Sequence, residues 1–463
     1  RDPKRGGTIR MIYTLPALFA TIGSILCFIG FRKKERTVSV FTSLLSLISS
    51  ILILFSKNYS DSYFYVDNLS KIFSLMIAIV YFGVVIFSIE YISNIKERFI
   101  KVYQYFMLLN IFVAAMFFSV ILNNLGLIWV GVEATTFSSA LLVAVENDFT
   151  ALEAAWRYII IVSVGLVISL IATLFLYSAC DTLSIVKLLA IKPTGSLFLL
   201  GAILLIIGYG TKTGIFPMNT WLADAHGKSP APVSAIFSAV LLPVSLYPII
   251  RLFQVYHNTL LSEFAFILGF LSVSTASIMS LNQKLYKRLF AYSSIENMGL
   301  ALIGISLGSY ALFGAIVLIF AHAFAKSGIF MLTGNILHNY KSKKIKDING
   351  IIKTMPHTGL FLFFGSLAVT GAPPSAIFFG EFLILSKTID LYGWLIGSIL
   401  IFFVGCGFLF INYKVINMVF SGQRKKAIKE SNFTLVPIIN ITLSILTLIF
   451  LPFLYRFLQG VIK

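Results

Sequence analysis

Hydrophobic runs of about twenty residues repeat along nearly the whole chain, separated by short polar or charged stretches. A helix crossing the hydrocarbon core of a bilayer needs about 20 predominantly apolar residues, so each run predicts one transmembrane helix. The pattern predicts an all-α polytopic membrane protein with about fourteen such helices, each about 20 to 28 residues long. The predicted helices begin near Met11, Val38, Leu69, Val102, Asn124, Ala155, Ser196, Ala231, Phe264, Leu289, Ala311, Thr358, Tyr392 and Thr434.

Composition supports a single membrane domain, because the chain of 463 residues is 58% hydrophobic and only 12% charged. The first run, from Met11 to Phe31, is long enough to span and lacks a small-residue cleavage pattern. We therefore expect a retained transmembrane helix rather than a signal peptide. Residues 1–10 are predicted to form an N-terminal tail, and we expect this tail to be non-native because Met11 would be a natural initiator.

The net charge of +18 follows membrane topology, so it does not indicate nucleic-acid binding. Most basic residues fall in loops after odd-numbered predicted helices: Arg32, Lys33, Lys34, Arg36, Lys96, Arg98, Lys101, Lys284, Lys287, Arg288, Lys341, Lys343, Lys344, Lys346, Lys353, Arg424, Lys425, Lys426 and Lys429. Loops after even-numbered helices hold few, mainly Lys57, Lys187, Lys192, Arg251 and Lys387. The positive-inside rule then predicts that the odd-numbered loops are cytoplasmic and that, with an even number of helices, both termini lie on the outer side. We expect the membrane to be the cytoplasmic membrane of a prokaryote. The basic residues among 1–10 run against this orientation.

Metal, redox and nucleotide chemistry are not expected in this chain. Cys27, Cys180 and Cys406 are far apart and show no Cys-x-x-Cys spacing. The chain also lacks a glycine-rich phosphate loop after a strand. Energy for any transport must therefore come from an ion gradient or from a partner.

The segment GYGTKTGIFPMNTWLADAH, from Gly208 to His226, carries an ionisable residue where a spanning helix would be apolar. Lys212 has no solvating water there, and charged residues inside a membrane typically mark ion pathways. Gly214 and Pro217 predict that the helix is interrupted close to this lysine, as in many transporters. Charge and interruption together indicate ion transport.

Further ionisable residues lie in other apolar runs. Glu133 lies in the fifth run, and His322 and Lys326 are four residues apart, hence on one face of the eleventh predicted helix. Glu381 follows a second Pro/Gly interruption, formed by Gly371, Pro373 and Pro374. This segment looks like a second version of the Lys212 segment.

Such charges can also simply pair with a neighbour and fix helix packing. Each one costs about 3 kcal/mol or more near the bilayer centre, so a set on four helices, two of them interrupted, favours ion transport over packing. For charges near helix ends, which can reach interfacial water, the packing interpretation is stronger. These are Asp148, Glu153, Arg157, Asp224 and His226.

The two interruptions are about five helices apart, which predicts two inverted repeats of five helices each, with ion sites at the broken helices 7 and 12. The first repeat would cover residues 102–256 and the second residues 257–421. Residues 11–101 would form the three preceding helices, and residues 422–463 a basic loop and the last helix.

Three strings carry a family resemblance: GYGTKTGIFPMNTWLADAHGKSPAPVSA, KRLFAYSSIENMG and HAFAKSGIFMLTGN. They resemble the antiporter-like subunits of complex I, of energy-converting membrane-bound hydrogenases and of Mrp antiporters, over roughly residues 70–420. The resemblance implies fourteen helices with two inverted five-helix repeats.

The resemblance also implies roles for particular residues. Glu133 would be the acidic partner, Lys212 the central lysine and Glu381 the terminal charge, with His322 and Lys326 on the connecting helix. Modulating roles fall to Arg157, Asp224, His226 and Glu296. Arginine hardly deprotonates, so Arg157 would act only through its charge. The SSIE around Glu296 looks most like the hydrogenase 4 and formate hydrogenlyase type. The short stretch after the last predicted helix favours a mid-arm or hydrogenase-type subunit.

The expected function is an ion-translocating subunit, for protons or sodium, of a redox-driven membrane complex. Its partners would be other membrane subunits, including further antiporter-like ones, and a peripheral redox arm. Iron–sulfur clusters, with nickel–iron, flavin or quinone as further candidates, would reside in those partners. A Mrp-type Na⁺/H⁺ antiporter subunit without redox partners is the alternative, and a non-conducting scaffold is a third interpretation that the intact charge set disfavours.

Overall fold

The computed structural model describes residues 3–29, 34–95, 97–422, 430 and 432–462. By its internal contacts the chain divides into two units, which we describe separately. Unit 1 comprises Arg1–Lys212 and Val244–Leu261, and unit 2 comprises Thr213–Pro243 and Ser262–Lys463. The basic residues at 32–33, 96 and 424–429, used above for the orientation, and the basic loop predicted after residue 421, lie largely outside the described residues.

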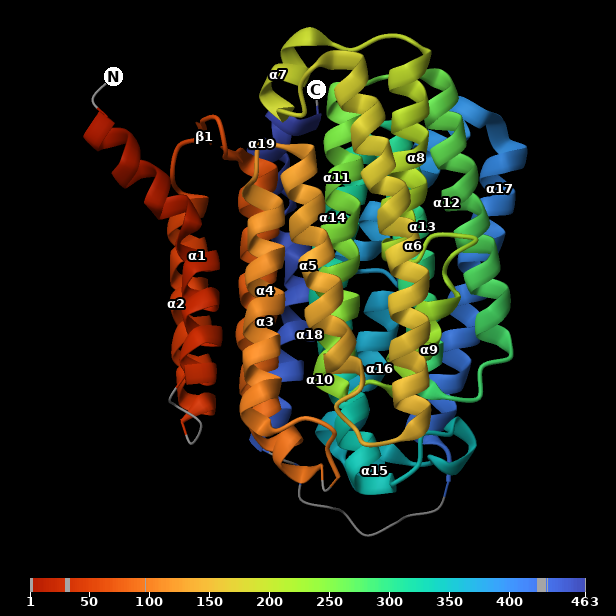
Figure 1. The fold of residues 1–463 in the computed structure, drawn as a ribbon. Helices are drawn as coiled ribbons and strands as arrows, with labels where there is room; N and C mark the ends of the chain where they lie inside the picture. The colour runs from red at the N-terminus through yellow and green to blue at the C-terminus, as the bar shows by residue number, and fades with distance from the viewer. Residues whose placement is uncertain (1–2, 30–33, 96, 423–429, 431, 463) are drawn as a thin grey trace. The chain divides into compact units, whose positions relative to one another are not determined.

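Unit 1 is helical apart from one short hairpin, in which Tyr59 pairs with Val66 and Ser60 with Tyr65. Its elements are α1 (Pro3–Ile29), α2 (Glu35–Leu54), β1 (Tyr59–Ser60), β2 (Tyr65–Val66), α3 (Asn68–Tyr91), η1 (Ile92–Asn94), α4 (Val102–Ile121), α5 (Leu125–Val143), α6 (Phe149–Cys180), α7 (Ile185–Ile191), α8 (Ser196–Thr213) and α11 (Leu242–Val255). Helices α3 to α6 run side by side in Figure 1. Helix α1 begins at Pro3, inside the stretch predicted as a tail.

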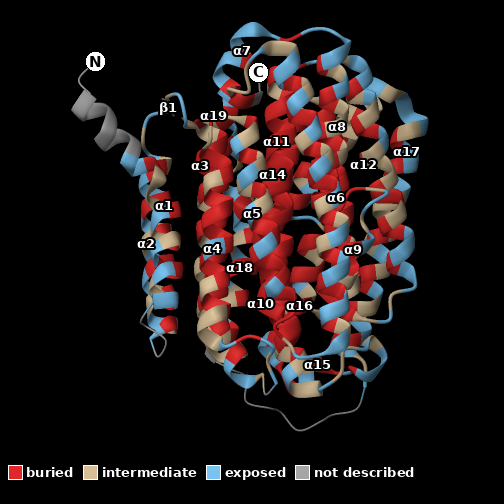
Figure 2. Ribbon diagram, viewed as in Figure 1, coloured by how far each residue is buried: buried red, intermediate tan, exposed pale blue. Residues whose placement is uncertain are grey.

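Unit 2 contains the remaining helices. They are α9 (Thr220–Lys228), α10 (Ala231–Ile236), η2 (Phe237–Leu241), α12 (Thr259–Leu281), α13 (Tyr286–Leu307), α14 (Ser309–Tyr340), η3 (Ile345–Asp347), α15 (Ile351–Thr354), α16 (Pro356–Val369), α17 (Ala376–Phe420), η4 (Asn432–Thr434), α18 (Leu435–Leu446), η5 (Thr447–Phe450) and α19 (Leu451–Ile462). Figure 2 shows that α14 is buried over nearly its whole length. This helix therefore lies in the interior of unit 2.

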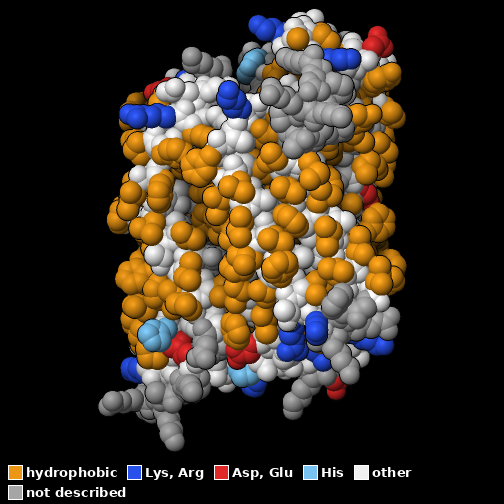
Figure 3. Space-filling model, turned by 90° about the vertical axis from the view of Figure 1, so that its left-hand side faces the viewer, with side chains coloured by type: hydrophobic (Ala, Val, Ile, Leu, Met, Phe, Trp, Pro, Cys, Tyr) orange, Lys and Arg blue, Asp and Glu red, His pale blue; other side chains and the backbone are white. Residues whose placement is uncertain are grey.

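Thirteen helices of the described residues are long and apolar enough to cross a membrane. On the face drawn in Figure 3, hydrophobic side chains form a broad band and charged side chains gather towards its two ends. This distribution matches a hydrocarbon core between two polar interfaces. The chain is therefore an all-α multi-pass membrane protein.

The interruption predicted at Gly371, Pro373 and Pro374 lies between α16 and α17, whereas the separate span predicted to start near Tyr392 falls inside α17. Helix α16 has only 14 residues, and α17 has 45, with Gly393 in a non-helical conformation (φ 79°, ψ 171°) in its middle. The Gly-Ala-Pro-Pro segment, residues 371–374, shortens the first span because proline cannot continue a helix. Glycine tolerates positive φ, so the second apolar run bends at Gly393 without stopping.

Helix starts in both units are fixed by short polar side chains. The Asp67 side chain accepts a hydrogen bond from the Ser70 N–H at the start of α3, and Asn124 caps α5 in the same way. Ser375 caps α17 through the Phe378 N–H, directly after the second interruption. Such caps satisfy N–H groups that the helix itself leaves unpaired. They fix where the helices that carry Glu133 and Glu381 begin.

A π-helical turn, η2, leads from α10 into α11. The Leu242 N–H bonds to the carbonyl of Phe237, five residues earlier instead of four. Pro243 follows directly, and it lacks an N–H while its ring crowds the carbonyl one turn before. The wider turn accommodates this proline without ending the helix.

Candidate functional site

Lys212 lies in the last turn of α8 and is fully buried. Its ammonium donates to the carbonyl oxygen of Val132 at 2.6 Å and to the hydroxyl oxygens of Thr135 at 2.7 Å and Thr136 at 2.6 Å. A lysine ammonium has three N–H donors, so these contacts satisfy all of them. All three acceptors come from α5, which therefore replaces the water that this charge lost.

Glu133 occupies the same stretch of α5, between the carbonyl and the two hydroxyls that bind Lys212. It is half-buried, and its Oε2 has no hydrogen-bond partner among the described residues. The carboxylate and the Lys212 ammonium interact through their charges, while the three N–H donors point to other atoms. We call Lys212, Val132, Glu133, Thr135 and Thr136 the first lysine site. Its charge pair can separate without breaking a direct hydrogen bond.

Immediately after Lys212 the chain leaves helical geometry. Helix α8 ends at Thr213, Gly214 has φ 82°, and α9 begins at Thr220. Within unit 2, the Phe216 N–H donates to the Ser272 hydroxyl at 2.9 Å, which satisfies one backbone group of the interruption. Irregular backbone is tolerated in a membrane only where protein or water supplies such partners.

Unit 2 holds a second buried lysine, Lys326, on α14. Its ammonium donates to the carbonyl oxygen of Phe290 at 2.6 Å and to the hydroxyl of Ser293, both on α13. His322 lies one turn earlier on the same face of α14 and is also fully buried. The structure thus brings the predicted pair onto one face, as the spacing of four residues requires.

Glu381 lies in the second turn of α17 and is 6% exposed. Its carboxylate packs against Gly371 in the interrupted segment, where an added Cβ would come within 1.9 Å of Oε2. Next to it, Gly380 lies against Gly314, where an added Cβ would meet the Gly314 carbonyl oxygen at 2.6 Å. Small residues of this kind let helix backbones approach closely. The close approach of Gly380 to α14 fixes the position of α17, and with it the carboxylate of Glu381 against Gly371.

The contact at Gly371 leads to a testable prediction. We expect Gly371→Ala to lower ion pumping about tenfold or more, because the methyl group displaces the Glu381 carboxylate. Gly393→Ala is the matched control, since Gly393 also has positive φ but has no atom within 4 Å of an added Cβ. Both changes should cost about 1–3 kcal/mol of stability from backbone strain. Equal pumping by the two variants, measured in vesicles at matched amounts of protein, would contradict a role for the Glu381 position.

The predicted modulating residues occupy different surroundings. Asp224 on α9 forms an ion pair with Arg288 of α13 at 3.1 Å, and both side chains are partly exposed. His226 is fully buried and stacks on Phe330, with ring centroids 4.7 Å apart. Neither ring nitrogen of His226 has a hydrogen-bond partner in the described part of the chain.

Arg157 and Glu296 complete the predicted set. The Arg157 guanidinium contacts Glu153, one turn earlier on α6, at 2.6 Å, and both side chains are about half exposed. The structure therefore places Arg157 in a surface ion pair on α6. Glu296 lies inside α13, is 7% exposed and accepts a hydrogen bond from the Ser277 hydroxyl at 3.3 Å.

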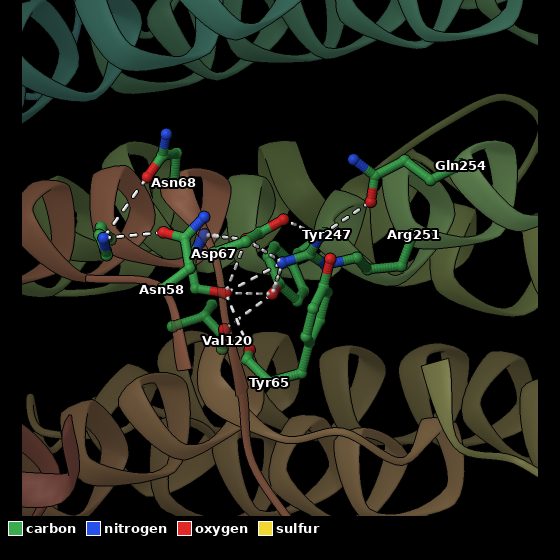
Figure 4. Close-up of polar contacts among 10 residues, drawn as sticks. Asn58, Tyr65, Asp67, Asn68, Val120, Tyr247, Arg251 and Gln254 are labelled. Carbon is green, nitrogen blue, oxygen red and sulfur yellow. Dashed lines mark hydrogen bonds and ion pairs between the residues drawn. The ribbon is translucent and has the colours of Figure 1, made fainter. Parts of the chain in front are cut away.

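Sequence reasoning did not identify a buried ion pair in unit 1, where Arg251 had been assigned to a loop. Arg251 lies inside α11, is fully buried, and donates to the two carboxylate oxygens of Asp67 at 2.6 and 2.7 Å. Figure 4 shows the guanidinium between Asp67 and Tyr247, with Gln254 accepting a further hydrogen bond. The two charged residues are 184 positions apart, and an apolar α11 gave no sign of the partner. Only the folded chain reveals this pair.

Metal and disulfide chemistry have little support in the part of the chain that the structure describes. It contains no group of three or more His, Cys, Asp or Glu side chains placed to hold a metal ion. Cys27, Cys180 and Cys406 are free thiols. The described site instead contains protonatable side chains within apolar helices, and such side chains can transfer ions.

The fold and these sites define an ion-translocating polytopic membrane protein, and comparison with known proteins gives its family. Residues 122–408 match the sequence family described as NADH:quinone oxidoreductase/Mrp antiporter, transmembrane. The chain belongs to this family, as an antiporter-like membrane subunit of the complex I, hydrogenase-4 and Mrp superfamily. It is 35% identical to the hydrogenase-4 component F homolog of Methylacidiphilum infernorum, over 80% of this chain and 82% of that protein.

Solved structures show the same fold at low sequence identity. A chain of an archaeal respiratory membrane complex, the membrane-bound sulfane sulfur reductase, superposes with a TM-score of 0.88 at 23% identity, covering 98% of this chain and 96% of that one. A chain of respiratory complex I from Thermus thermophilus gives a TM-score of 0.86 at 18% identity, covering 97% and 98%.

Proposed function

We propose that this chain translocates ions, protons in the first instance and sodium as the alternative, as an antiporter-like subunit of a redox-driven membrane complex. The observation that carries the proposal is the first lysine site. The fully buried Lys212 ammonium donates all its N–H groups to atoms of α5, and it interacts by charge with Glu133, which also lies on α5. A lysine in an apolar span without such a task would be costly.

The step at this site is a charge switch. Two unit charges about 4 Å apart at an effective dielectric of about 20 attract by about 4 kcal/mol, and by about 1.7 kcal/mol at about 10 Å. When Glu133 is close, Lys212 holds its proton. When a neighbouring subunit draws Glu133 away, Lys212 releases the proton, which passes on to the set formed by His322, Lys326 and Glu381. Moving one charge against about 100 mV costs about 2.3 kcal/mol, which is similar to the change in attraction.

We further propose fourteen crossings arranged as two inverted five-helix repeats, residues 102–256 and 257–421. The length of α17 supports this count, because 45 residues would extend about 67 Å, more than twice the hydrocarbon thickness. Bent at Gly393, α17 would supply the second half of a broken twelfth helix, begun by α16, and the whole thirteenth. The interruption after α8 would break the seventh helix in the same way.

The partners we propose are further antiporter-like membrane subunits and a peripheral redox arm that holds the iron–sulfur clusters and any nickel–iron, flavin or quinone site. The name of the Methylacidiphilum relative supports a hydrogenase-4-type complex. The SSIE sequence around Glu296 supports the same assignment. We propose the cytoplasmic membrane as the location, with the basic odd-numbered loops inside and both termini outside.

Purification from native membranes in mild detergent, followed by mass spectrometry, tests this proposal. We expect hydrogenase-like or iron–sulfur subunits to co-purify. In vesicles, the electron donor used by those subunits should drive ion uptake that a protonophore abolishes and a sodium ionophore leaves intact. Co-purification of small antiporter subunits alone would instead establish a Mrp-type exchanger. Electron transfer without any ion uptake would contradict ion translocation and leave a scaffold.

A further inference from the structure

The two buried lysines are held in the same manner, each within its own unit. Lys212 donates to one backbone carbonyl and to hydroxyls on α5, the helix that carries Glu133. Lys326 donates to one backbone carbonyl and to one hydroxyl on α13, the helix that carries Glu296. In both units a lysine is thus bound by polar atoms of a helix whose own glutamate is close by.

Glu296 has the surroundings of a working carboxylate. It lies three residues after Ser293, hence on the same side of α13 as the hydroxyl that binds Lys326. It is 7% exposed, and its one described hydrogen bond is to the Ser277 hydroxyl of α12. The charged groups that act on it are Lys326 of α14 and Glu381 of α17. A buried carboxylate with one weak neutral partner is unfavourable unless it interacts with a cation or a proton.

The second half of α17 leaves space for this carboxylate at one position. A Cβ added at Gly407 would lie 2.3 and 2.5 Å from the two carboxylate oxygens of Glu296. Any residue other than glycine would push the carboxylate aside. Gly405, two residues earlier on the same helix, has open space around an added Cβ. The absence of a side chain at Gly407 therefore leaves the room that the Glu296 carboxylate occupies.

We propose that Glu296 and Lys326 form a second glutamate–lysine pair and that Glu296 carries the proton between Lys326 and Glu381. In the first step the Lys326 ammonium gives its proton to the Glu296 carboxylate, leaving a neutral amine and a carboxylic acid. In the second step the acid gives that proton to the Glu381 carboxylate, and Glu296 regains its negative charge. Lys326 then takes up the next proton. This inference rests on the proposed ion-translocating function.

The test compares variants in the intact complex. We expect Glu296→Gln, which keeps the shape but cannot take up the proton, to lower pumping on the order of tenfold or more. Gly407→Ala should also lower pumping and shift its pH profile, because it moves the carboxylate without removing it. Gly405→Ala is the matched control and should keep the wild-type rate and profile. Glu296→Asp, which keeps a carboxylate on a shorter side chain, should pump faster than Glu296→Gln. A purely structural role would predict the reverse, because glutamine matches the shape of glutamate better.

A second measurement does not depend on pumping. The infrared difference spectrum of the purified complex on a pH jump should contain a carboxylic C=O band that disappears in Glu296→Gln and moves in Gly407→Ala. Wild-type pumping and an unchanged spectrum in both variants would overturn the role of Glu296. If Lys212→Ala still abolishes pumping in the same preparation, that result would overturn only the role of Glu296 and would leave the proposed ion translocation standing. If the wild-type complex moves no ions, the proposed function itself fails.

Discussion

Lys212→Ala is expected to abolish ion pumping, with a loss of about 100-fold or more. The side chain is the proposed proton carrier of the first lysine site, where it donates to Val132, Thr135 and Thr136. The variant is also expected to lower stability, because it leaves the half-buried Glu133 carboxylate without its cation. Donor-driven proton uptake in vesicles, at equal amounts of assembled complex, measures the effect.

Two further variants show whether the charge or the proton matters. Lys212→Arg keeps a positive charge but hardly deprotonates, so it should also fail to pump. Lys187→Ala removes an exposed lysine of α7 in the same unit and should pump at the wild-type rate. A Lys212→Ala variant that pumps normally would rule out the charge switch at this site. A pumping Lys212→Arg variant would show that Lys212 acts through its charge alone.

The membrane-spanning segments were largely predictable because bilayer thickness fixes their length. The predicted starts at Met11, Val102, Ser196 and Ala231 coincide with starts of candidate spans in the structure. The bend at Gly393 could not be predicted, since an uninterrupted apolar run does not distinguish one bent helix from two. Hydrophobicity reports burial in lipid or protein, and it carries little information on local backbone angles.

The sequence predicted the charged residues of the candidate site but not the polar residues that bind them. Lys212, Glu133, His322, Lys326 and Glu381 stand out because they are ionisable residues in apolar runs, whereas Glu296 was found only through the family resemblance. Their partners do not stand out. Threonine and serine are common in transmembrane helices, so nothing in the sequence marks Thr135, Thr136 or Ser293 as the groups that bind a lysine. Such contacts depend on how distant helices pack, which one sequence without structure does not give.

Removal of one partner of the Asp67–Arg251 pair is expected to have the largest effect on stability. Arg251→Leu leaves the Asp67 carboxylate buried without its cation, and breaking a buried ion pair in this way costs about 3–5 kcal/mol. Arg157→Leu is the matched control, because Arg157 contacts Glu153 at the same 2.6 Å but its side chain is 57% exposed. Exposed pairs contribute about 0–1 kcal/mol. Thermal unfolding of the full chain in detergent should separate the two variants.

The pH dependence of the same pair provides an independent test. Burial raises the pKa of Asp67, which directly precedes the α3 span, but the Arg251 charge and the hydrogen bonds from Arg251 and Ser70 lower it below its ordinary value overall. A lowered pKa in the folded state means that Asp67 stabilises the fold above its unfolded pKa of about 3.9 and loses this contribution as the pH falls through the folded value. The double variant Asp67→Asn/Arg251→Leu removes both charges, so it should be more stable than Arg251→Leu and should lack this acid transition. An Arg251→Leu variant as stable as Arg157→Leu would show that the pair contributes nothing to folding, and Asp67 would then have to be neutral in the native protein.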